Sequence, residues 1–239
     1  MTATPFERPP EETKRLARWA GAVYLSLGVA TVFGFFHAPL VHDDLNATAR
    51  AITGPELRFR IGVVTDVLST ALAVPLGLLL YQLFKPVHKT HAALMALLLL
   101  VAIPMSFVVA LNYVAAQMLL NGAHEVSAFT GAQRDALGLF FLRLHTHGVL
   151  AVEIFWGLWL FPFGLLVIRS RFLPRVLGIL LIIAGVAYVA HSVTSLLLAG
   201  QRIVLYERVT MLARAGEFPI MLWLLIKGAD ARRESSGAA

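Results

Sequence analysis

The chain has 239 residues, of which 58% are hydrophobic and only 14% charged, and its formal net charge is +6 at pH 7. A soluble domain has about 45–50% apolar and about 25% charged residues, so this composition excludes an ordinary soluble fold and predicts a surface that faces lipid. The absence of cysteine excludes disulfides, thiolate metal sites and thiol nucleophiles. The basic residues form short clusters beside apolar segments, a membrane-topology signal that gives no indication of nucleic-acid binding.

Six long apolar segments follow one another along the chain, at residues 16–38, 57–84, 92–120, 136–168, 176–198 and 209–226. A helix needs about 20 such residues to cross the bilayer, and the segments lack the alternation of barrel strands. The sequence therefore predicts an all-α integral membrane bundle of six transmembrane helices. We expect a single domain over residues 1–239, with flexible ends at about 1–14 and 229–239.

The basic residues are distributed unequally between the two sides of these segments. One side has twelve, namely Arg8, Lys14, Arg15, Arg18, Lys85, Lys89, Arg169, Arg171, Arg175, Lys227, Arg232 and Arg233. The opposite side has six, namely Arg50, Arg58, Arg60, Arg134, Arg202 and Arg208. The positive-inside bias predicts that both termini are cytoplasmic, in a multi-pass protein of the bacterial inner membrane.

Several ionisable residues fall inside the predicted spans, where each is expensive and therefore a candidate site residue. We expect the ligand-binding set to be Arg60, Asp66, His145, Glu153, His191, Arg214 and Glu217. At about 1.5 Å per residue from the nearest basic anchor, Glu217 lies at about 15 Å and Asp66 at about 28 Å, and His145 lies higher still. Glu153 and His191 each lie at about 24 Å, and Arg214 at about 20 Å. The sequence thus predicts a polar pocket in the extracytoplasmic half of the bilayer, above an apolar floor.

Helical phase divides the ionisable residues of the fourth segment. His145 and Glu153 share one side, while Arg143 and His147 share the opposite side. We therefore expect His145 and Glu153 to face inward. Their partners remain open at this point: Asp66 is expected to pair with Arg60 or Arg214, and Arg214 can also pair with Glu217 three residues on.

A divalent metal is a further hypothesis for these side chains. By residue type alone, Asp66, His145, His191 and Glu217 could bind such an ion together. A histidine in a helix bundle is, however, more often hydrogen-bonded to a serine, threonine or carbonyl than bound to metal. Helical spacing does not say whether the four converge.

The order of several short blocks resembles a bacterial six-span family known as domain of unknown function 4386. The blocks are Phe59-Arg60-x-Gly62 with Asp66, Leu80-Tyr81 with Lys85-Pro86-Val87, Leu144-His145 with Gly148, Arg169-Ser170-x-x-Leu173-Pro174-Arg175 with Gly178, and Gly216-Glu217 with Trp223-Leu224-x-x-Lys227-Gly228. The resemblance implies a compact six-helix membrane fold and no activity. It also implies a second histidine after Gly157, where this chain has Trp159.

The sequence leaves several functions open for this multi-pass membrane protein, whose partners are expected to be the lipid bilayer and a small-molecule or lipid ligand. One is binding of that ligand in the polar pocket. A second is a membrane-embedded hydrolase, which would use a metal ion or a histidine–carboxylate pair against a lipid-like substrate. A third is transport of a small solute, with helices interrupted at Pro75, Pro104 and Pro219. A fourth is a structural accessory subunit.

Overall fold

The computed structural model describes residues 10–37, 56–122, 124, 127–198 and 204–229. The sequence also predicts a short interfacial helix at residues 45–52 and contains a glycosylation sequon, Asn46-Ala47-Thr48; both lie outside the described residues. The flexible ends expected in the sequence lie mostly outside them too.

Helices make up nearly all of the described chain, and it contains no strand. In order they are α1 (Pro10–His37), α3 (Glu56–Phe84), α4 (Lys89–Leu120), α5 (Gly131–Leu158), α6 (Leu160–Arg169), α7 (Arg175–Leu197), α8 (Val204–Arg214), the short 3₁₀ helix η2 (Ala215–Glu217) and α9 (Phe218–Ile226). Six stretches are long and apolar enough to cross a membrane: Pro10–Gly34, Arg60–Phe84, Lys89–Leu120, Gly131–Arg169, Arg175–Leu197 and Arg208–Ile226. Each matches one predicted segment, so the predicted six-helix membrane fold is confirmed.

Two of the six spans are divided. The fourth consists of α5 and α6, which meet at Trp159, and Pro162 follows in the first turn of α6. Proline has no N–H to give to the carbonyl four residues back, here Leu158, and its ring crowds that carbonyl. The sixth span consists of α8, η2 and α9, with Pro219 at the start of α9. The predicted interruption at Pro219 is therefore confirmed.

The predicted interruptions at Pro75 and Pro104 are wrong. Pro75 lies inside the continuous helix α3 and Pro104 inside the continuous helix α4. A membrane helix tolerates a proline where neighbouring helices and small local adjustments accommodate the freed carbonyl.

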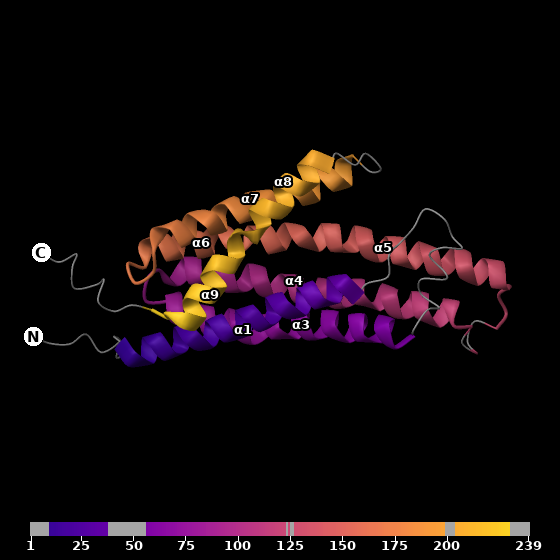
Figure 1. Ribbon diagram of the computed structural model, residues 1–239, viewed down its shortest axis with the longest axis horizontal. Coiled ribbons are helices and arrows are strands. Elements are labelled where there is room, and N and C mark those ends of the chain that lie inside the picture. Colours follow the sequence, from indigo (N-terminus) through magenta and orange to yellow (C-terminus); the bar gives the residue numbers. More distant parts are fainter. Residues whose placement is uncertain (1–9, 38–55, 123, 125–126, 199–203, 230–239) are drawn as a thin grey trace, which may run out of the picture.

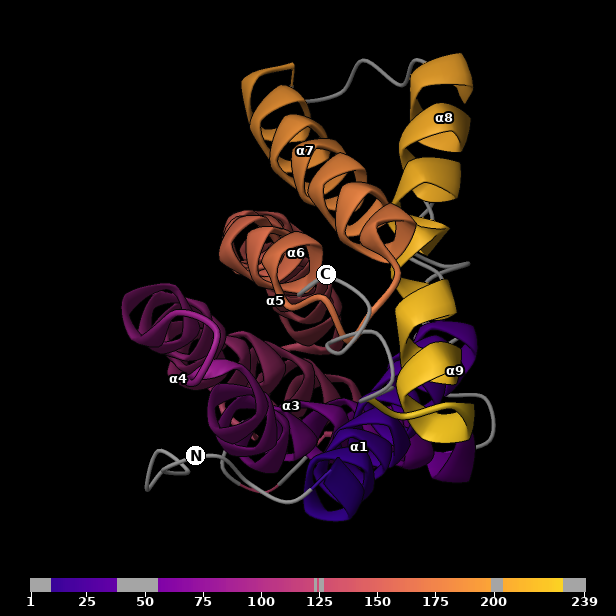
Figure 2. The same ribbon diagram turned by 90° about the vertical axis from the view of Figure 1, so that its left-hand side faces the viewer.

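The two halves of the sixth span have different neighbours. α9 packs on α1, whereas α8 packs on α7. Figure 2, which looks along the bundle, shows α9 beside α1 and α8 beside α7, with α5 and α6 between α4 and α7. Figure 1 shows that α7 and α8 run together and incline away from α3 and α4. The break in the sixth span thus lies where the chain leaves α7 and turns to α1.

Glycines set the closest helix contacts. Gly157 lies against Gly185, and Gly164 lies against Gly178, so two pairs spaced seven residues apart join α5 and α6 to the antiparallel α7. A methyl group added at Gly178 would lie 2.5 Å from the Gly164 carbonyl oxygen. Small residues at such contacts let helix backbones approach closely, which is how membrane helices gain packing energy.

The apolar core is concentrated at the end of the bundle where α1 begins and α9 ends, which we call the closed end. Its fully buried side chains come from α1, α3, α4, α6, α7 and α9, and include Tyr24, Leu76, Leu80, Phe84, Met95, Phe163, Leu166, Leu181, Ile220 and Leu224. A much smaller cluster around Ala116 and Leu142 lies toward the other end, which we call the open end. Among the described residues, the two ends therefore differ in how many buried apolar side chains they contain.

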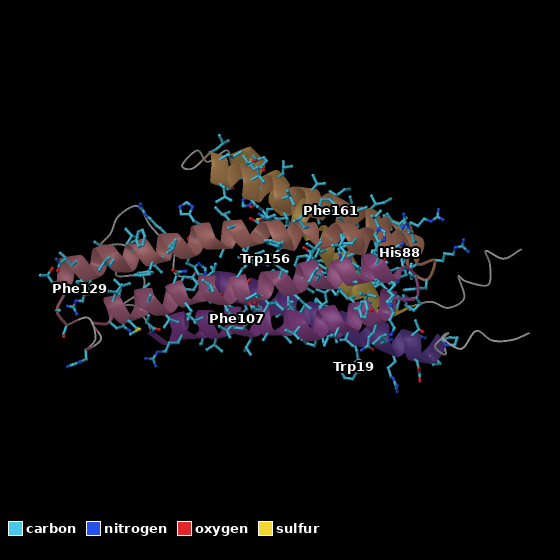
Figure 3. All side chains as sticks on the ribbon, turned by 180° about the vertical axis from the view of Figure 1, so that it is seen from behind. Trp19, His88, Phe107, Phe129, Trp156 and Phe161 are labelled. Atoms are coloured by element: carbon cyan, nitrogen blue, oxygen red, sulfur yellow. The ribbon has the colours of Figure 1, made fainter. Side chains whose placement is uncertain are left out.

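The outer surface of the bundle is apolar. Large hydrophobic side chains on several helices are exposed, among them Trp19, Phe107 and Leu212. Figure 3 shows side chains projecting all around the bundle, with Trp19 near one end, Phe107 midway along and Phe129 near the other end. Such a surface is suited to lipid and not to water. The fourth span is the most interior, since 56% of its most apolar stretch is buried, against at most 39% for any other span.

Candidate functional site

The break in the sixth span directs two neighbouring charged residues to different partners. Arg214 ends α8, which packs on α7, and Glu217 ends η2 just before α9 turns to α1. Gly216 permits this bend to lie close to α7, because a Cβ at that position would be 3.0 Å from the Leu180 carbonyl oxygen. The irregular backbone thus lies at membrane depth but inside the protein, where the bilayer tolerates it.

Glu153 is the centre of the polar contacts. Its side chain is only 3% exposed, yet both carboxylate oxygens have partners. One oxygen, Oε1, accepts a hydrogen bond from Nη1 of Arg214, and the other, Oε2, lies 2.8 Å from Nδ1 of His191. These contacts join α5, α7 and α8. A buried carboxylate is stable only when paired in this way.

Glu217 forms the second half of the same network. Its carboxylate accepts a hydrogen bond from the Tyr24 hydroxyl of α1 and also bonds to Tyr188 of α7. The Arg214 guanidinium carbon lies 5.5 Å from the centre of the Tyr188 ring, in a cation–π arrangement. Tyr188 therefore lies between the two carboxylates. We call the six residues Tyr24, Glu153, Tyr188, His191, Arg214 and Glu217 the polar cluster.

Neighbouring side chains hold the polar cluster in place. The Tyr206 hydroxyl of α8 donates to Oγ1 of Thr194 on α7 at 3.1 Å. The Tyr206 ring is nearly parallel to the His191 ring, with 6.4 Å between the two ring centres. The ring of Tyr24, whose hydroxyl bonds to Glu217, packs edge-on against Trp159, with 5.6 Å between the two ring centres. Trp159, which stands where the family resemblance implied a histidine, is thus an apolar support under the cluster.

His145 and Asp66 lie elsewhere. The buried His145 ring stacks on Tyr113 at 3.6 Å, and Asp66 on α3 is close enough to Tyr113 to interact electrostatically. His145 precedes Glu153 by eight residues, about 12 Å along α5. Arg60 is exposed at the start of the second span.

These positions decide several predictions. His145 and Glu153 are buried while Arg143 and His147 are exposed, as helical phase predicted. Arg214 pairs with Glu153 of α5, neither with Asp66 nor with its near neighbour Glu217. His191 bonds to a carboxylate, where a serine, threonine or carbonyl was expected.

The four residues of the metal hypothesis do not form one centre. Asp66 and His145 lie beside Tyr113, whereas His191 and Glu217 belong to the polar cluster. Within the described part of the chain, no group of three or more histidine, aspartate or glutamate side chains is placed to hold a metal ion. The residues would need one common location to act as a single metal site.

The tyrosines of the site were not predicted as site residues, although a signal for Tyr24 existed. Counted from Lys14, Tyr24 lies about 15 Å into the first span, the same depth as Glu217 counted from Lys227. Equal depth on two different helices is a condition for contact. It is not sufficient, because it leaves the rotation and the neighbours of each helix unknown.

A comparison of the whole chain with protein families decides its classification. The family model described as "Domain of unknown function (DUF4386)" matches residues 19–228. The chain belongs to this family. The DUF4386 match includes every residue of the polar cluster and confirms the resemblance seen in the short sequence blocks. No curated protein and no solved structure matches the chain. The chemistry of this DUF4386 protein therefore has to be inferred from its own residues.

Proposed function

We propose that this protein binds a ligand with an anionic group, a carboxylate or a phosphate, at the polar cluster within the membrane. The observation that supports this proposal most directly is the order in which the side chains of the cluster are exposed. Arg214 is 23% exposed and His191 16%, while Glu153 beneath them is 3% exposed. An approaching ligand would meet the cationic and hydrogen-bond-donating groups before the carboxylate.

Arginine geometry supports this assignment. A guanidinium has five N–H donors in one plane and commonly binds carboxylate or phosphate through two of them. In the polar cluster, Nη1 of Arg214 donates to Glu153 and Nε donates to the Thr210 carbonyl at 3.4 Å. Within the part of the chain that the structure describes, these two contacts leave the Nη2 donors for a ligand. Tyr188 holds the guanidinium plane from one side.

Among the described residues, packing disfavours access from the closed end. The closed end is filled by side chains with no exposed surface, including Leu80, Phe163 and Leu224. If the positive-inside orientation holds, a ligand would reach the cluster from the extracytoplasmic side or sideways from lipid.

A structural role is the alternative, and a specific observation favours it. Both oxygens of Glu153 are already paired within the protein, so the cluster can hold α5, α7 and α8 together without any ligand. Transport would require binding as its first step, and we propose only that step. We do not propose a metal-dependent hydrolase, because the four residues suggested as metal ligands lie in two separate places.

Ligand-dependent thermal stabilisation of the detergent-purified protein tests the proposal. Two anionic probes represent the two sources of ligand: hexanoate for a free solute and dihexanoyl phosphatidylglycerol for a lipid headgroup. Hexanol and dihexanoylglycerol, which lack the carboxylate and the phosphate, are the matched neutral controls. A ligand at 100 times its Kd stabilises the folded state by about 2.7 kcal/mol, so binding raises Tm measurably.

Two variants make the test specific. Arg214→Gln removes the proposed anion-binding group, and we expect it to abolish the shift caused by the anions. Arg143→Gln removes an exposed arginine of α5 and should leave that shift intact. If neither anion stabilises the wild-type protein more than its neutral control does, binding is contradicted and the structural role is favoured.

A further inference from the structure

We propose that the anionic ligand is a membrane amphiphile, whose head group binds at Arg214 and whose hydrocarbon chain passes between α1 and α8 into the lipid. This inference rests on the proposed function, and it names the class of ligand and the route to the same site. It follows from the order in which the helices pack, from the exposure of side chains along α1 and α5, and from the apolar side chains beside the route.

The described helices form a ring that is complete at only one end of the bundle. α1 packs on α3, α3 on α4, α4 on α5, and α5 on α7. The sixth span follows α7, but only its second half, α9, packs on α1. Its first half, α8, makes no extensive contact with α1 among the described residues, and Figures 1 and 2 both show α8 apart from α1. Beyond the break toward the open end, α8 therefore does not close the ring.

One face of α1 shows this change in its exposure. A Cβ at Gly21 or Gly28 would contact α9, and both glycines are buried, as is Tyr24 between them. Thr31 and Val32 follow Gly28 by three and four residues, so they continue the same face one turn further on. Both are exposed. The face of α1 that α9 covers is thus left uncovered by the described residues beyond the polar cluster.

The face of α5 that carries Glu153 changes in the same way. Thr146 precedes Glu153 by two helical turns and therefore lies on its face of the helix, toward the open end. Glu153 is buried, whereas Thr146 is exposed. Thr31 is likewise two turns from the buried Tyr24. Two faces that are buried at the polar cluster are thus exposed about 10 Å beyond it.

The helices beside this gap present apolar side chains. Val32 on α1 is exposed, and so are Met211 and Leu212, which lie within one turn of Arg214 on α8. A hydrocarbon chain placed between the two helices would contact apolar groups and would remain out of water along its whole length. The head group would meanwhile reach the guanidinium, which binds phosphate or carboxylate strongly. An amphiphile therefore suits both the charge of the site and the surface of its approach.

A route along the bundle axis is less suitable. Toward the open end, Ala116 of α4 and Leu142 of α5 are fully buried, and Val63 of α3 packs against them. A hydrated anion that followed these three helices would meet this apolar cluster. Among the described residues, neither α1 nor α8 contributes to it, so the route between α1 and α8 passes outside it.

Photolabelling of the full-length protein in phosphatidylcholine nanodiscs tests the route. The anionic probe is dodecyl phosphate with a diazirine near its head group, and the neutral control is dodecanol with the same diazirine. Because both probes contact the lipid-facing surface, the ratio of their labelling isolates the effect of the charged head. We expect the phosphate to label α1 residues 28–33 about tenfold more than the alcohol does, as one charge-assisted hydrogen bond would give. The ratio should be about one at the exposed Leu97 of α4.

Three variants locate the site. Arg214→Gln removes the group that binds the head, so the excess labelling by the phosphate should disappear. Thr31→Trp fills the gap from α1 and should have the same effect, and Met211→Trp fills it from α8. Phe33→Trp is the matched control, because Phe33 is exposed about 200° around α1 from Thr31 and the change should leave the excess intact. A Tm without ligand equal to that of the wild type shows which variants are folded, and either gap-filling variant is sufficient.

The outcomes separate this inference from the proposed function. Equal labelling by the two probes, with hexanoate or dihexanoyl phosphatidylglycerol still stabilising the wild-type protein, overturns the lipid route and leaves the anion site in place. Excess labelling that persists in a folded gap-filling variant and disappears in Phe33→Trp overturns the position between α1 and α8. If the phosphate probe shows no excess and neither anion stabilises the protein, the proposed function and this inference fail together.

Discussion

Glu153 and Glu217 show how this protein keeps two carboxylates at membrane depth. Glu153 is paired with a guanidinium and an imidazole, whereas Glu217 is hydrogen-bonded to two phenol groups. The first arrangement gives the carboxylate two nitrogen partners, and the second gives it two hydroxyl partners, each of which can donate or accept a hydrogen bond. The two acids can therefore have different tasks within one network.

The hydrogen bond from Tyr24 to Glu217 should be measurable as stability. In Tyr24→Phe the ring remains and the buried carboxylate loses one donor, which we expect to lower the free energy of unfolding by about 1–3 kcal/mol. Thermal or denaturant unfolding in detergent measures the change. Tyr81→Phe, at another tyrosine packed against the same core, is the matched control and should cost less. An equal loss in both variants would show that the hydroxyl of Tyr24 has no special role.

The ion pair between Glu153 and Arg214 predicts a strong energetic coupling. Each of the variants Glu153→Gln and Arg214→Gln leaves the other residue's charge without its partner inside the protein. The double variant removes both charges and should be more stable than the sum of the single losses implies. A double-mutant cycle should give a coupling of about 1–3 kcal/mol, and strict additivity would mean that the two side chains act independently.

Sequence reasoning found four of the six members of the polar cluster, all except the two tyrosines, but not their partners. Equal depths of about 24 Å for Glu153 and His191, and about 20 Å for Arg214, placed the three at one level of the bilayer, and the structure brings them into contact. The partner of Arg214 could not be predicted. Depth gives position along a helix axis, whereas pairing depends on which helices are neighbours and how each is rotated.

At the level of elements, the sixth span has two halves with separate attachments. α9 is fixed to α1, since a Cβ at Gly21 would lie 2.3 Å from the Leu225 backbone nitrogen. α8 instead follows α7. The sequence predicted the break at Pro219 but also breaks at Pro75 and Pro104, because a proline removes the same hydrogen bond everywhere. Whether the helix continues depends on packing that the sequence does not display.

The glycine pairs between the fourth span and α7 predict which substitutions the fold cannot tolerate. In Gly178→Ala the new methyl group meets the Gly164 carbonyl at 2.5 Å, and a backbone atom cannot move aside cheaply. We expect a loss of about 1–3 kcal/mol or more from overpacking. Gly131→Ala is the matched control, because nothing lies within 4 Å of a Cβ there. Unfolding of both variants in detergent checks this, and equal stability would contradict close contact of the two helices.

For the whole molecule, the two ends of the bundle differ in composition as well as in packing. The closed end combines the large apolar core with basic residues such as Lys14, Lys85 and Arg175. The polar cluster lies deeper, and the interhelical core beyond it is smaller. An uninterrupted polar path across the membrane would have to cross the apolar core. Among the described residues, this asymmetry agrees with the access from one side that we propose for the polar cluster.

The orientation of the bundle can be measured because the chain has no cysteine, so a single introduced cysteine is an unambiguous label site. Lys89 follows the α3–α4 turn at the closed end, and Ser127 lies in the α4–α5 connection at the open end; both are exposed. The excess of basic residues at the closed end predicts that this end is cytoplasmic. A membrane-impermeant maleimide should therefore label Ser127→Cys in bacterial cells with a permeabilised outer membrane, and Lys89→Cys only after the inner membrane is broken. The reverse pattern would place the closed end outside, and the polar cluster would then receive its ligand from the cytoplasm.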